Sequence, residues 1–426
     1  MPKTIVVLGG GTGGLVVARR LAREKGGHKI VLVERDPVYR FDDLDEFVRG
    51  ATFRGSEVML TIWGTPSWAN GGKGLQFLPT KLTDLTAFSR ALADRYDGTR
   101  PGFPFVRYYT VWNESNRGQF LSPQFDAKGK LVAPSVYARL YRAAYAGIKG
   151  GNPRALVGTG ETASNGRDRP TSTPGLQQTS SPGKFAELLA KERPKIKFDG
   201  WSLHPYPTSP GLPPTQQTRW PNVTLNQLQR FGTSLDTWFK RKDTPIWITE
   251  YAHETKPGEP SGVTYSQQRS YAQTALTIAR HDPRVRMFIW FILRDDPTST
   301  WQSGLIERDG SKKPAFGTFS ALAHLLDGRN PILSVKSGQA APTIRISALE
   351  LYARSGPGAI VGMNVRVLDG TSVVVSSQPQ TTIDSEGWVT LTIPFQPPSG
   401  RSYRVEIEVV DASANRIVRT VTLNGV

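Results

Sequence analysis

The sequence contains no cysteine and no long hydrophobic run, and each absence excludes a class of site or location. Without cysteine there are no disulfides, no thiolate metal ligands and no cysteine nucleophile. No stretch approaches the roughly 18 apolar residues of a membrane-spanning helix. Only Lys3 precedes the first short apolar run, which ends in glycines, so we expect a strand and a turn there and no signal peptide. We therefore expect no membrane partner, no metal site and, from this N-terminus, a cytoplasmic chain.

Acidic residues are in the minority, with 36 Asp and Glu against 53 Lys and Arg, and the formal net charge is +17. A balance of this sign is typical of proteins that bind nucleic acid or an acidic polymer. However, basic clusters such as residues 240–242 are short and isolated, and no basic run is interleaved with aromatic residues. The pattern therefore favours a solvated, arginine-rich surface and no nucleic-acid partner.

The first 36 residues have the pattern of a dinucleotide-binding unit. Residues 4–8 are a short β-branched run typical of a buried parallel strand, and residues 14–25 have apolar positions at helical spacing. Residues 29–33 predict a second strand, and Glu34 follows it 20 residues after the last glycine of the turn. Between the first strand and the helix, three glycines fit the pattern G-x-G-x-x-G: Gly9, Gly11 and Gly14. Glycines at this spacing permit a tight turn and close approach of a pyrophosphate to the helix N-terminus.

This opening unit resembles the start of FAD- or NAD-dependent oxidoreductases, in particular flavoproteins of the sulfide:quinone reductase and NADH dehydrogenase type. The resemblance implies that Gly9, Gly11 and Gly14 approach the pyrophosphate and that Glu34 accepts a hydrogen bond from a ribose hydroxyl. It ends near Arg40, and no second glycine fingerprint follows. The same right-handed βαβ unit also builds many other α/β folds.

From residue 42 onward, helical and strand patterns alternate, beginning with a helix that contains Leu44, Phe47 and Val48. Strands are predicted at residues 58–63, 105–112, 155–159, 200–204, 245–250 and 287–293. Helices are predicted at residues 82–96, 136–148, 182–192, 225–240, 265–281 and 314–326. With the two opening strands this gives eight strands in about 330 residues, which predicts an α/β fold of the (β/α)8 TIM-barrel class.

Two carboxylates follow predicted strands at the end of the barrel that carries active sites. Glu114 follows the fourth strand and Glu250 ends the seventh. Retaining glycoside hydrolysis needs such a pair, with one ionised carboxylate that attacks the sugar and one protonated carboxyl that protonates the leaving oxygen. Two further acids, Glu161 and Glu254, are interpreted as loop residues without a catalytic role.

Asn113-Glu114 after an apolar strand, with Glu250 ending a later one, resembles clan A glycoside hydrolases, within their cellulase-like and β-xylosidase-like members. The segments GTPSWA (64–69) and HPYP (204–207) resemble the same group, and the resemblance covers about residues 41–326. It implies that Glu114 is the general acid/base and Glu250 the nucleophile. It also implies that Asn113 binds the sugar 2-hydroxyl and that His204 and Tyr206 support the two carboxylates. Trp290 and Trp68 would form platforms on which sugar rings stack. For both tryptophans a place in the core is an equal alternative.

Together these patterns indicate a chimera. Residues 1–40 are a Rossmann-like βαβ unit in the place of barrel strands one and two, and residues 41–328 are the remainder of the glycosidase barrel. We therefore expect GGGTGG to serve as barrel wall and to bind no cofactor. Barrel closure requires strand one to pair with strand eight, and strand two with strand three.

After residue 328 the pattern changes to period-two alternation with regular turns. Strands are predicted at residues 343–351, 360–368, 388–393, 403–410 and 416–423. This predicts an all-β, immunoglobulin-like sandwich as an accessory domain over residues 335–426. No exposed aromatic row indicates sugar binding, so a packing or spacer role is favoured.

Three functions remain open. The first is a retaining glycoside hydrolase that acts on β-O-glycosidic bonds of an oligo- or polysaccharide. Replacement of the first two barrel strands would lower its activity. The second is a fragment of an FAD- or NAD-binding oxidoreductase. The third is a barrel that binds carbohydrate without hydrolysing it. We expect a monomer in each case, and a secreted parent for the glycosidase part.

Overall fold

The computed structural model describes most of the chain, and it divides into two compact units. The described residues are 4–8, 30–33, 41–53, 56–174, 176–296, 301–326, 332–337, 341–347, 360–383, 388–411 and 416–425. One unit consists of Thr4–Ala252 and Asp282–Gly304 and is called the sheet unit here. The other includes His253–His281 and Leu305–Val426 and is called the sandwich unit.

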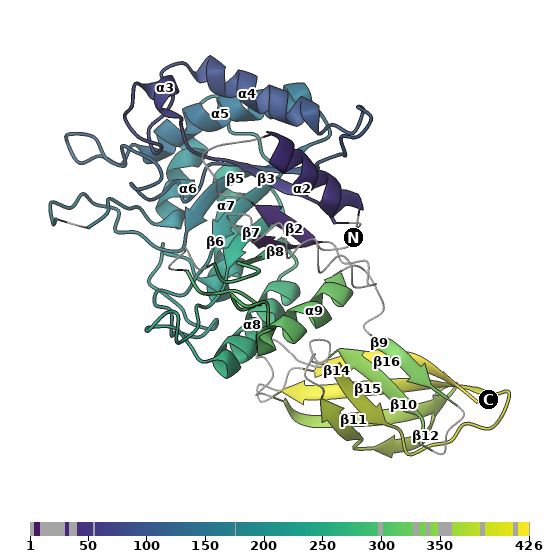
Figure 1. Cartoon of the computed structure of the whole chain (residues 1–426). Helices are drawn as coiled ribbons and strands as arrows, with labels where there is room; N and C mark the ends of the chain where they lie inside the picture. Colours follow the sequence, from purple (N-terminus) through teal and green to yellow (C-terminus); the bar gives the residue numbers. More distant parts are fainter. Residues whose placement is uncertain are drawn as a thin grey trace. The chain divides into compact units, whose positions relative to one another are not determined.

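Eight parallel strands form the centre of the sheet unit (Figure 1). They are β1 (Thr4–Leu8), β2 (Ile30–Val33), β3 (Met59–Ile62), β4 (Tyr108–Val111), β5 (Leu156–Ala163), β6 (Gly200–His204), β7 (Ile246–Tyr251) and β8 (Val285–Phe291). Their hydrogen-bonded order is β2-β1-β8-β7-β6-β5-β4-β3. This is the neighbour order of an eight-stranded barrel with its seam between β2 and β3. Because the strands are parallel, all their carboxyl ends lie at the same edge of the sheet.

The two opening strands belong to this sheet. Ile5 of β1 lies opposite Ile30 of β2 on one side and Phe288 of β8 on the other. The expected pairing of the first strand with the eighth is therefore confirmed. Within the described ranges, no hydrogen-bonded ladder joins β2 to β3. The predicted helix at 14–25 lies outside the described residues, as do the predicted cofactor residues Gly9, Gly11, Gly14 and Glu34.

Helices connect successive strands of the sheet unit. They are α2 (Phe41–Phe53), α3 (Ser67–Asn70), α4 (Leu82–Arg95), α5 (Ala133–Gly151), α6 (Pro182–Lys191), the 3-10 helix η1 (Leu225–Gln227) and α7 (Leu228–Phe239). From α4 to α7, each helix contacts the next (Figure 1). Tyr137, Tyr141, Ala144 and Ile148 recur at helical spacing and are buried on one face of α5. At the start of α6 the Ser181 side chain accepts a hydrogen bond from a backbone N–H of the first turn.

The interior of the sheet is filled around the indole of Trp247 in β7. Met59, Met287 and Ile289 pack with this side chain in one buried cluster. Gly200 lies directly against the ring, where a Cβ would come within 2.5 Å of an indole atom. Glycine on β6 therefore makes room for an aromatic ring from the neighbouring strand.

The described residues of the sandwich unit form two helices and eight strands. The helices α8 (Tyr265–His281) and α9 (Pro314–Leu326) lie side by side (Figure 1). The strands are β9 (Ile332–Lys336), β10 (Thr343–Ser347), β11 (Ile360–Asp369), β12 (Ser372–Ser377), β13 (Gln380–Ile383), β14 (Trp388–Thr392), β15 (Ser402–Asp411) and β16 (Arg416–Asn424). They form two antiparallel sheets with the orders β13-β14-β10-β9 and β12-β11-β15-β16.

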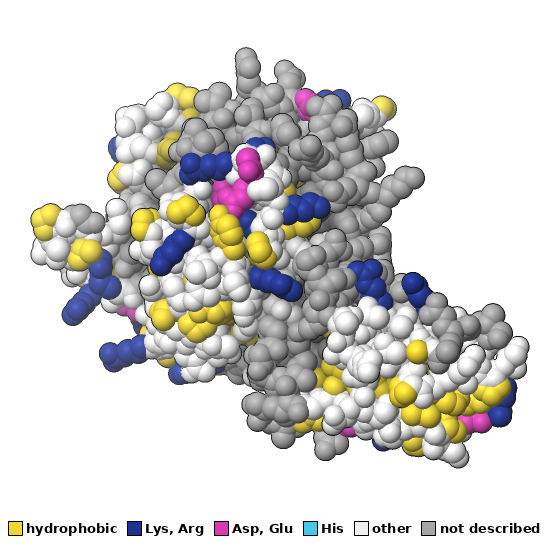
Figure 2. Space-filling model, turned by 60° about the horizontal axis from the view of Figure 1, so that its bottom comes forward, with side chains coloured by type: hydrophobic (Ala, Val, Ile, Leu, Met, Phe, Trp, Pro, Cys, Tyr) yellow, Lys and Arg dark blue, Asp and Glu magenta, His cyan; other side chains and the backbone are white. Residues whose placement is uncertain are grey.

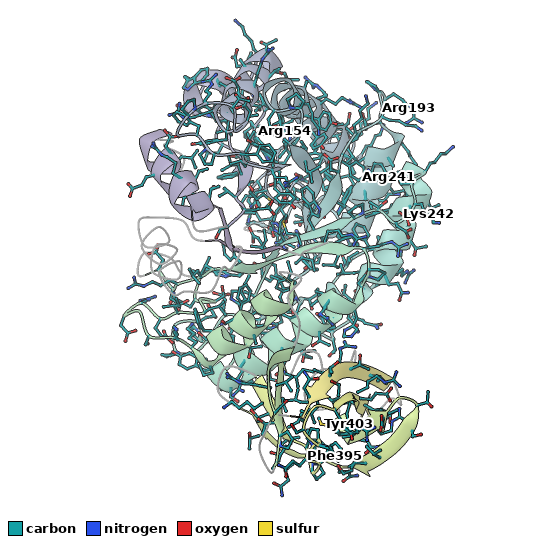
Figure 3. The ribbon with its side chains drawn as sticks, turned by 90° about the vertical axis from the view of Figure 1, so that its right-hand side faces the viewer. Arg154, Arg193, Arg241, Lys242, Phe395 and Tyr403 are labelled. Atoms are coloured by element: carbon teal, nitrogen blue, oxygen red, sulfur yellow. The ribbon has the colours of Figure 1, made fainter. Side chains whose placement is uncertain are left out.

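One hydrophobic core joins the two antiparallel sheets. Ile344 and Leu391 come from the first sheet, and Val405 and Ile407 from the second, and all four are buried in the same cluster. The rings of Phe395 and Tyr403, labelled in Figure 3, meet edge to face at 4.8 Å between centroids. A β-sandwich is therefore present, as predicted. Its assignment to the immunoglobulin-like class stays a prediction.

The basic side chains do not gather into one patch on the face drawn in Figure 2, where Lys and Arg are scattered among other residues. In the basic cluster at 240–242, the Arg241 guanidinium lies over the ring of Phe198 at 4.4 Å. It also donates a hydrogen bond of 2.7 Å to the Phe198 carbonyl, and Figure 3 labels it beside Lys242. In this cluster, Arg241 therefore packs against the protein surface and hydrogen-bonds to it. Within the part of the chain that the structure describes, no helix has the length and apolar character needed to cross a membrane.

Candidate active site

Four adjacent strands bring ionisable side chains to one edge of the parallel sheet. Glu114 follows β4, Glu161 lies in β5, His204 is the last residue of β6, and Glu250 is the penultimate residue of β7. The order β7-β6-β5-β4 makes each of these strands a neighbour of the next. Parallel strands place their carboxyl ends together, so residues distant in the sequence meet here.

The backbone that carries Glu114 has an unusual conformation. Trp112 and Glu114 both have positive φ angles, 77° and 37°, which residues with a side chain rarely adopt. The buried Trp112 is held by its backbone N–H, which donates to the Ile62 carbonyl at 2.7 Å. The next residue, Ser115, donates its backbone N–H to the Glu161 carbonyl at 3.0 Å. Backbone strain that the surroundings enforce in this way is typical of functional sites.

The four side chains form a compact group, here named the histidine–carboxylate cluster: Glu114, Glu161, His204 and Glu250. Nδ1 of His204 lies 3.4 Å from Oε1 of Glu114 and 3.6 Å from Oε2 of Glu250. Nε2 of the same ring lies 3.0 Å from Oε2 of Glu161. The Glu114 and Glu250 side chains are 14% and 19% exposed, whereas those of Glu161 and His204 are 3% and 1% exposed. Two carboxylates therefore reach solvent, and the third lies behind the histidine.

The cluster favours a positively charged imidazole. Burial alone lowers the pKa of His204, because the charged form loses its hydration. The negative charge of Glu250 and the hydrogen bonds to Glu114 and Glu161 outweigh this effect, and the pKa of His204 is raised well above its usual value. In its charged form the ring donates through both nitrogens. It therefore donates toward Glu161 on one side and toward the two outer carboxylates on the other.

Tyr206 contacts the second outer carboxylate. Its hydroxyl donates to Oε2 of Glu250 at 3.2 Å. The Tyr206 ring stacks on Tyr251, with centroids 5.9 Å apart and planes inclined by 12°, and it meets the edge of Trp301 at 5.7 Å. These ring contacts fix the direction of the hydroxyl toward Glu250.

Arg117 contacts the first outer carboxylate. Its Nε lies 3.1 Å from Oε2 of Glu114, and its terminal nitrogen donates to Oδ1 of Asn165 at 3.0 Å. Glu114 thus faces an imidazole through one oxygen and a guanidinium through the other. This arrangement stabilises negative charge on Glu114.

The remaining predicted site residues lie at different depths. Asn113 is half-buried beside Glu114, and Trp68 is 76% exposed on α3, which follows β3. Trp290 is fully buried in β8, and its indole N–H donates to the Ser303 carbonyl at 2.9 Å. Of the two interpretations of Trp290, this burial favours the core over a sugar platform. Sugar contacts by Asn113 and Trp68 stay predictions.

Three residues near the site were missed by the sequence analysis: Glu161, Arg117 and Trp301. The interpretation of Glu161 as a loop acid is wrong, because β5 continues to Ala163 and includes it. The predicted strand ended at residue 159, two residues before Glu161, whereas β5 ends at Ala163. Arg117 stands three positions after Glu114, a spacing that allows an ion pair. No sequence pattern distinguishes Trp301. The other acid interpreted as a loop residue, Glu254, does lie in the loop after β7.

The two outer carboxylates lie close enough together to act on one substrate bond. Because both oxygens lie within 3.6 Å of one nitrogen, they are at most about 7 Å apart, a bound that includes the roughly 5 Å of retaining glycosidases. Among the described residues, no group of three or more His, Asp or Glu side chains is arranged to hold a metal ion. The site presents two solvent-accessible carboxylates with a histidine, a tyrosine and an arginine around them.

Part of the chain matches a known family model, and the whole chain is similar in fold to solved glycoside hydrolases. Residues 220–319 match a family model described as the glycosyl hydrolase catalytic core. A monomeric β-xylosidase from Caulobacter crescentus CB15 aligns over 100% of this chain and 97% of its own, with 14% identity and a TM-score of 0.57. A family 39 glycoside hydrolase from Bacteroides cellulosilyticus WH2 aligns over 92% of this chain and 79% of its own, with 16% identity and a TM-score of 0.55.

A search of curated proteins gave no match. At these identities the structural likeness concerns the fold, because unrelated chemistries share the same barrel. The chain therefore has the fold of these glycoside hydrolases, and its residues 220–319 are similar to a glycosyl hydrolase catalytic core.

Proposed function

We propose that the protein is a retaining glycoside hydrolase that cleaves β-O-glycosidic bonds of oligo- or polysaccharides. The observation that carries the proposal is the pair Glu114 and Glu250, at the ends of β4 and β7, with one nitrogen of His204 between them. The similarity of residues 220–319 to a glycosyl hydrolase catalytic core supports it. A monomer is part of the proposal.

In the first step, the ionised carboxylate of Glu250 attacks the anomeric carbon. The bond to the leaving oxygen breaks, and that oxygen takes the proton of Glu114. The Tyr206 hydroxyl and the His204 ring face Glu250 and stabilise it as an anion before the attack. Both groups also fix the position of the nucleophile, which lowers the entropic part of the barrier.

In the second step, the ionised Glu114 takes a proton from water, and the resulting hydroxide attacks the same carbon. The bond between the sugar and Glu250 breaks, so both carboxyl groups return to their first state with overall retention of configuration. Arg117 stabilises the anionic form of Glu114 that acts as the base in this step.

The test is hydrolysis of a panel of aryl β-glycosides by the purified protein and by the variant Glu250→Gln. We expect hydrolysis by the unsubstituted chain with a β-configured first product, and a loss of kcat of more than about 10³-fold in the variant. Glu187→Gln, a change on α6 away from the site, is the matched control and should keep full activity. Binding of oligosaccharide without turnover by the unsubstituted chain would instead support a non-catalytic carbohydrate-binding barrel.

A further inference from the structure

Glu161 is a buried carboxylate that the double displacement does not use. Its side chain is 3% exposed and makes contact with His204, not with the open side of the site. Oε2 of Glu161 accepts from Nε2 of His204 at 3.0 Å and from the Thr249 hydroxyl at 3.2 Å. Its other oxygen, Oε1, has no hydrogen-bond partner among the described residues. Burying a carboxylate in this way is unfavourable unless a charged partner compensates for it.

The backbone also directs Glu161 into the site. Glu161 has a φ of 43°, and the ladder between β5 and β6 is irregular between Thr159 and Thr162. The Glu161 carbonyl is fixed by the Ser115 backbone N–H of the loop that carries Glu114. The strained conformation therefore places Glu161 behind His204 and connects its backbone to the loop of the acid/base residue.

We infer that Glu161 is a positioning residue that keeps His204 as an imidazolium, so that one fixed positive charge faces both Glu114 and Glu250. This inference rests on the proposed function. During the first step of the reaction, the negative charge leaves Glu250 as its oxygen bonds to the sugar, and Glu114 becomes negative as it gives up its proton. Nδ1 of His204 lies within 3.6 Å of both oxygens, so it stabilises the charge on whichever carboxylate carries it.

The groups around His204 leave Glu161 as the carboxylate best placed for this role. Glu114, with its partner Arg117, and Glu250, with Tyr206, both change charge or bonding during turnover. Tyr137 of α5 reaches the backbone of β5 beside Glu161, and burial raises the pKa of its hydroxyl, which stays neutral. Glu161 is therefore the carboxylate that contacts the ring and takes no part in the proposed bond changes.

The test combines histidine NMR with pH–rate profiles. The chain has five histidines, so 13C labelling at Cε1 gives few signals, and the one absent from His204→Gln is that of His204. In the unsubstituted chain this signal should stay at the imidazolium position at pH values where an ordinary histidine is already neutral. In Glu161→Gln it should titrate at lower pH, and the ratio of kcat at pH 8 to kcat at pH 6 should fall at least about tenfold. KM should change little.

Two variants separate charge from structure. Glu161→Asp keeps the negative charge, so it should retain the shape of the pH profile and the charged His204 signal even where kcat is lower. Glu187→Gln should leave both unchanged. The inference is overturned if His204 titrates near its ordinary pKa in the unsubstituted chain. It is also overturned if Glu161→Gln folds, leaves the signal unchanged and loses the same fraction of kcat at every pH. Should the unsubstituted chain hydrolyse no glycoside, the NMR titration still tests the pairing, and only the proposed function fails.

Discussion

At the scale of single residues, the hydrogen bond from Tyr206 to Glu250 is the contact whose contribution to catalysis is easiest to measure. One hydrogen bond of 3.2 Å joins the Tyr206 hydroxyl to this carboxylate. A hydrogen bond to a charged group contributes about 1.5–3 kcal/mol, so Tyr206→Phe should lower kcat by roughly 10- to 100-fold. The stacked ring remains in the variant, so the melting temperature should change little. Steady-state kinetics on an aryl β-glycoside and thermal unfolding measure the two effects.

Tyr145→Phe is the control for Tyr206→Phe, because this tyrosine lies on α5 and its ring packs against Tyr141. It should leave kcat unchanged. If Tyr206→Phe retains full kcat, the hydrogen bond to Glu250 has no part in the reaction. If both variants lose activity and stability together, the effect is structural.

A site residue can be predicted from the sequence when the end of the strand that carries it is clear. Glu114 and Glu250 were predictable because each follows an apolar run without interruption, and His204 and Tyr206 because HPYP marks the end of β6. Glu161 was not predicted, because the predicted strand ended at residue 159, whereas β5 continues to Ala163. The contacts among these side chains depend on sheet order and backbone angles, which a strand pattern does not contain.

At the scale of elements, one buried ion pair joins α2 to α4 in the sheet unit. Asp45 of α2 accepts from Arg95 Nε at 2.8 Å and from the Tyr96 hydroxyl at 2.6 Å. Asp45→Ala leaves the guanidinium and the buried hydroxyl without this partner. We therefore expect a loss of roughly 2–4 kcal/mol in the free energy of unfolding, measured with urea. Asp94→Ala, which removes an exposed pair with Arg100, should cost less than about 1 kcal/mol.

The same pair gives the stability a defined pH dependence. The hydrogen bond from Arg95 lowers the pKa of Asp45, which outweighs the opposite effect of burial. A carboxyl whose pKa is lower in the folded state stabilises the protein above its unfolded pKa, and this contribution is lost as the pH falls through the folded pKa. The difference in stability between the unsubstituted chain and Asp45→Asn should therefore shrink in acid. A difference that stays constant with pH would contradict this account.

Elements with a strong period were predicted well, and short or exposed ones were not. The predicted helices at 265–281 and 314–326 match α8 and α9 in both bounds. The strands β9, β12 and β13 were not predicted. Of these, β12 is a largely exposed edge strand, and its valines do not alternate between a buried and an open face. Periodicity reports burial on one face, so it is weak where an edge strand is exposed on both.

At the scale of the whole molecule, the role of the opening segment is the main question. Residues 4–8 pair with β8 and residues 30–33 pair with β1, so both lie within the sheet. Deleting residues 1–33 would uncover the edge of β8, a buried central strand. We expect the shortened chain to be aggregated or unfolded and inactive, as measured by solubility, circular dichroism and glycoside hydrolysis.

An absorbance scan of the purified full chain is the companion measurement, and we expect no flavin band. A shortened chain that keeps its melting temperature and activity, beside a full chain that carries flavin, would identify the opening segment as an independent cofactor module.

All four side chains of the histidine–carboxylate cluster come from β4 to β7 or the residue stretches directly after them. The strands on the other side of the sheet contribute backbone hydrogen bonds in the right register, a requirement that many apolar sequences satisfy. We therefore expect the cluster to be insensitive to which apolar segment supplies β1 and β2, provided that the segment pairs with β8 in the same register. A protein in which another apolar βαβ segment replaces these two strands should keep the four side chains in place, because none of them lies on β1 or β2.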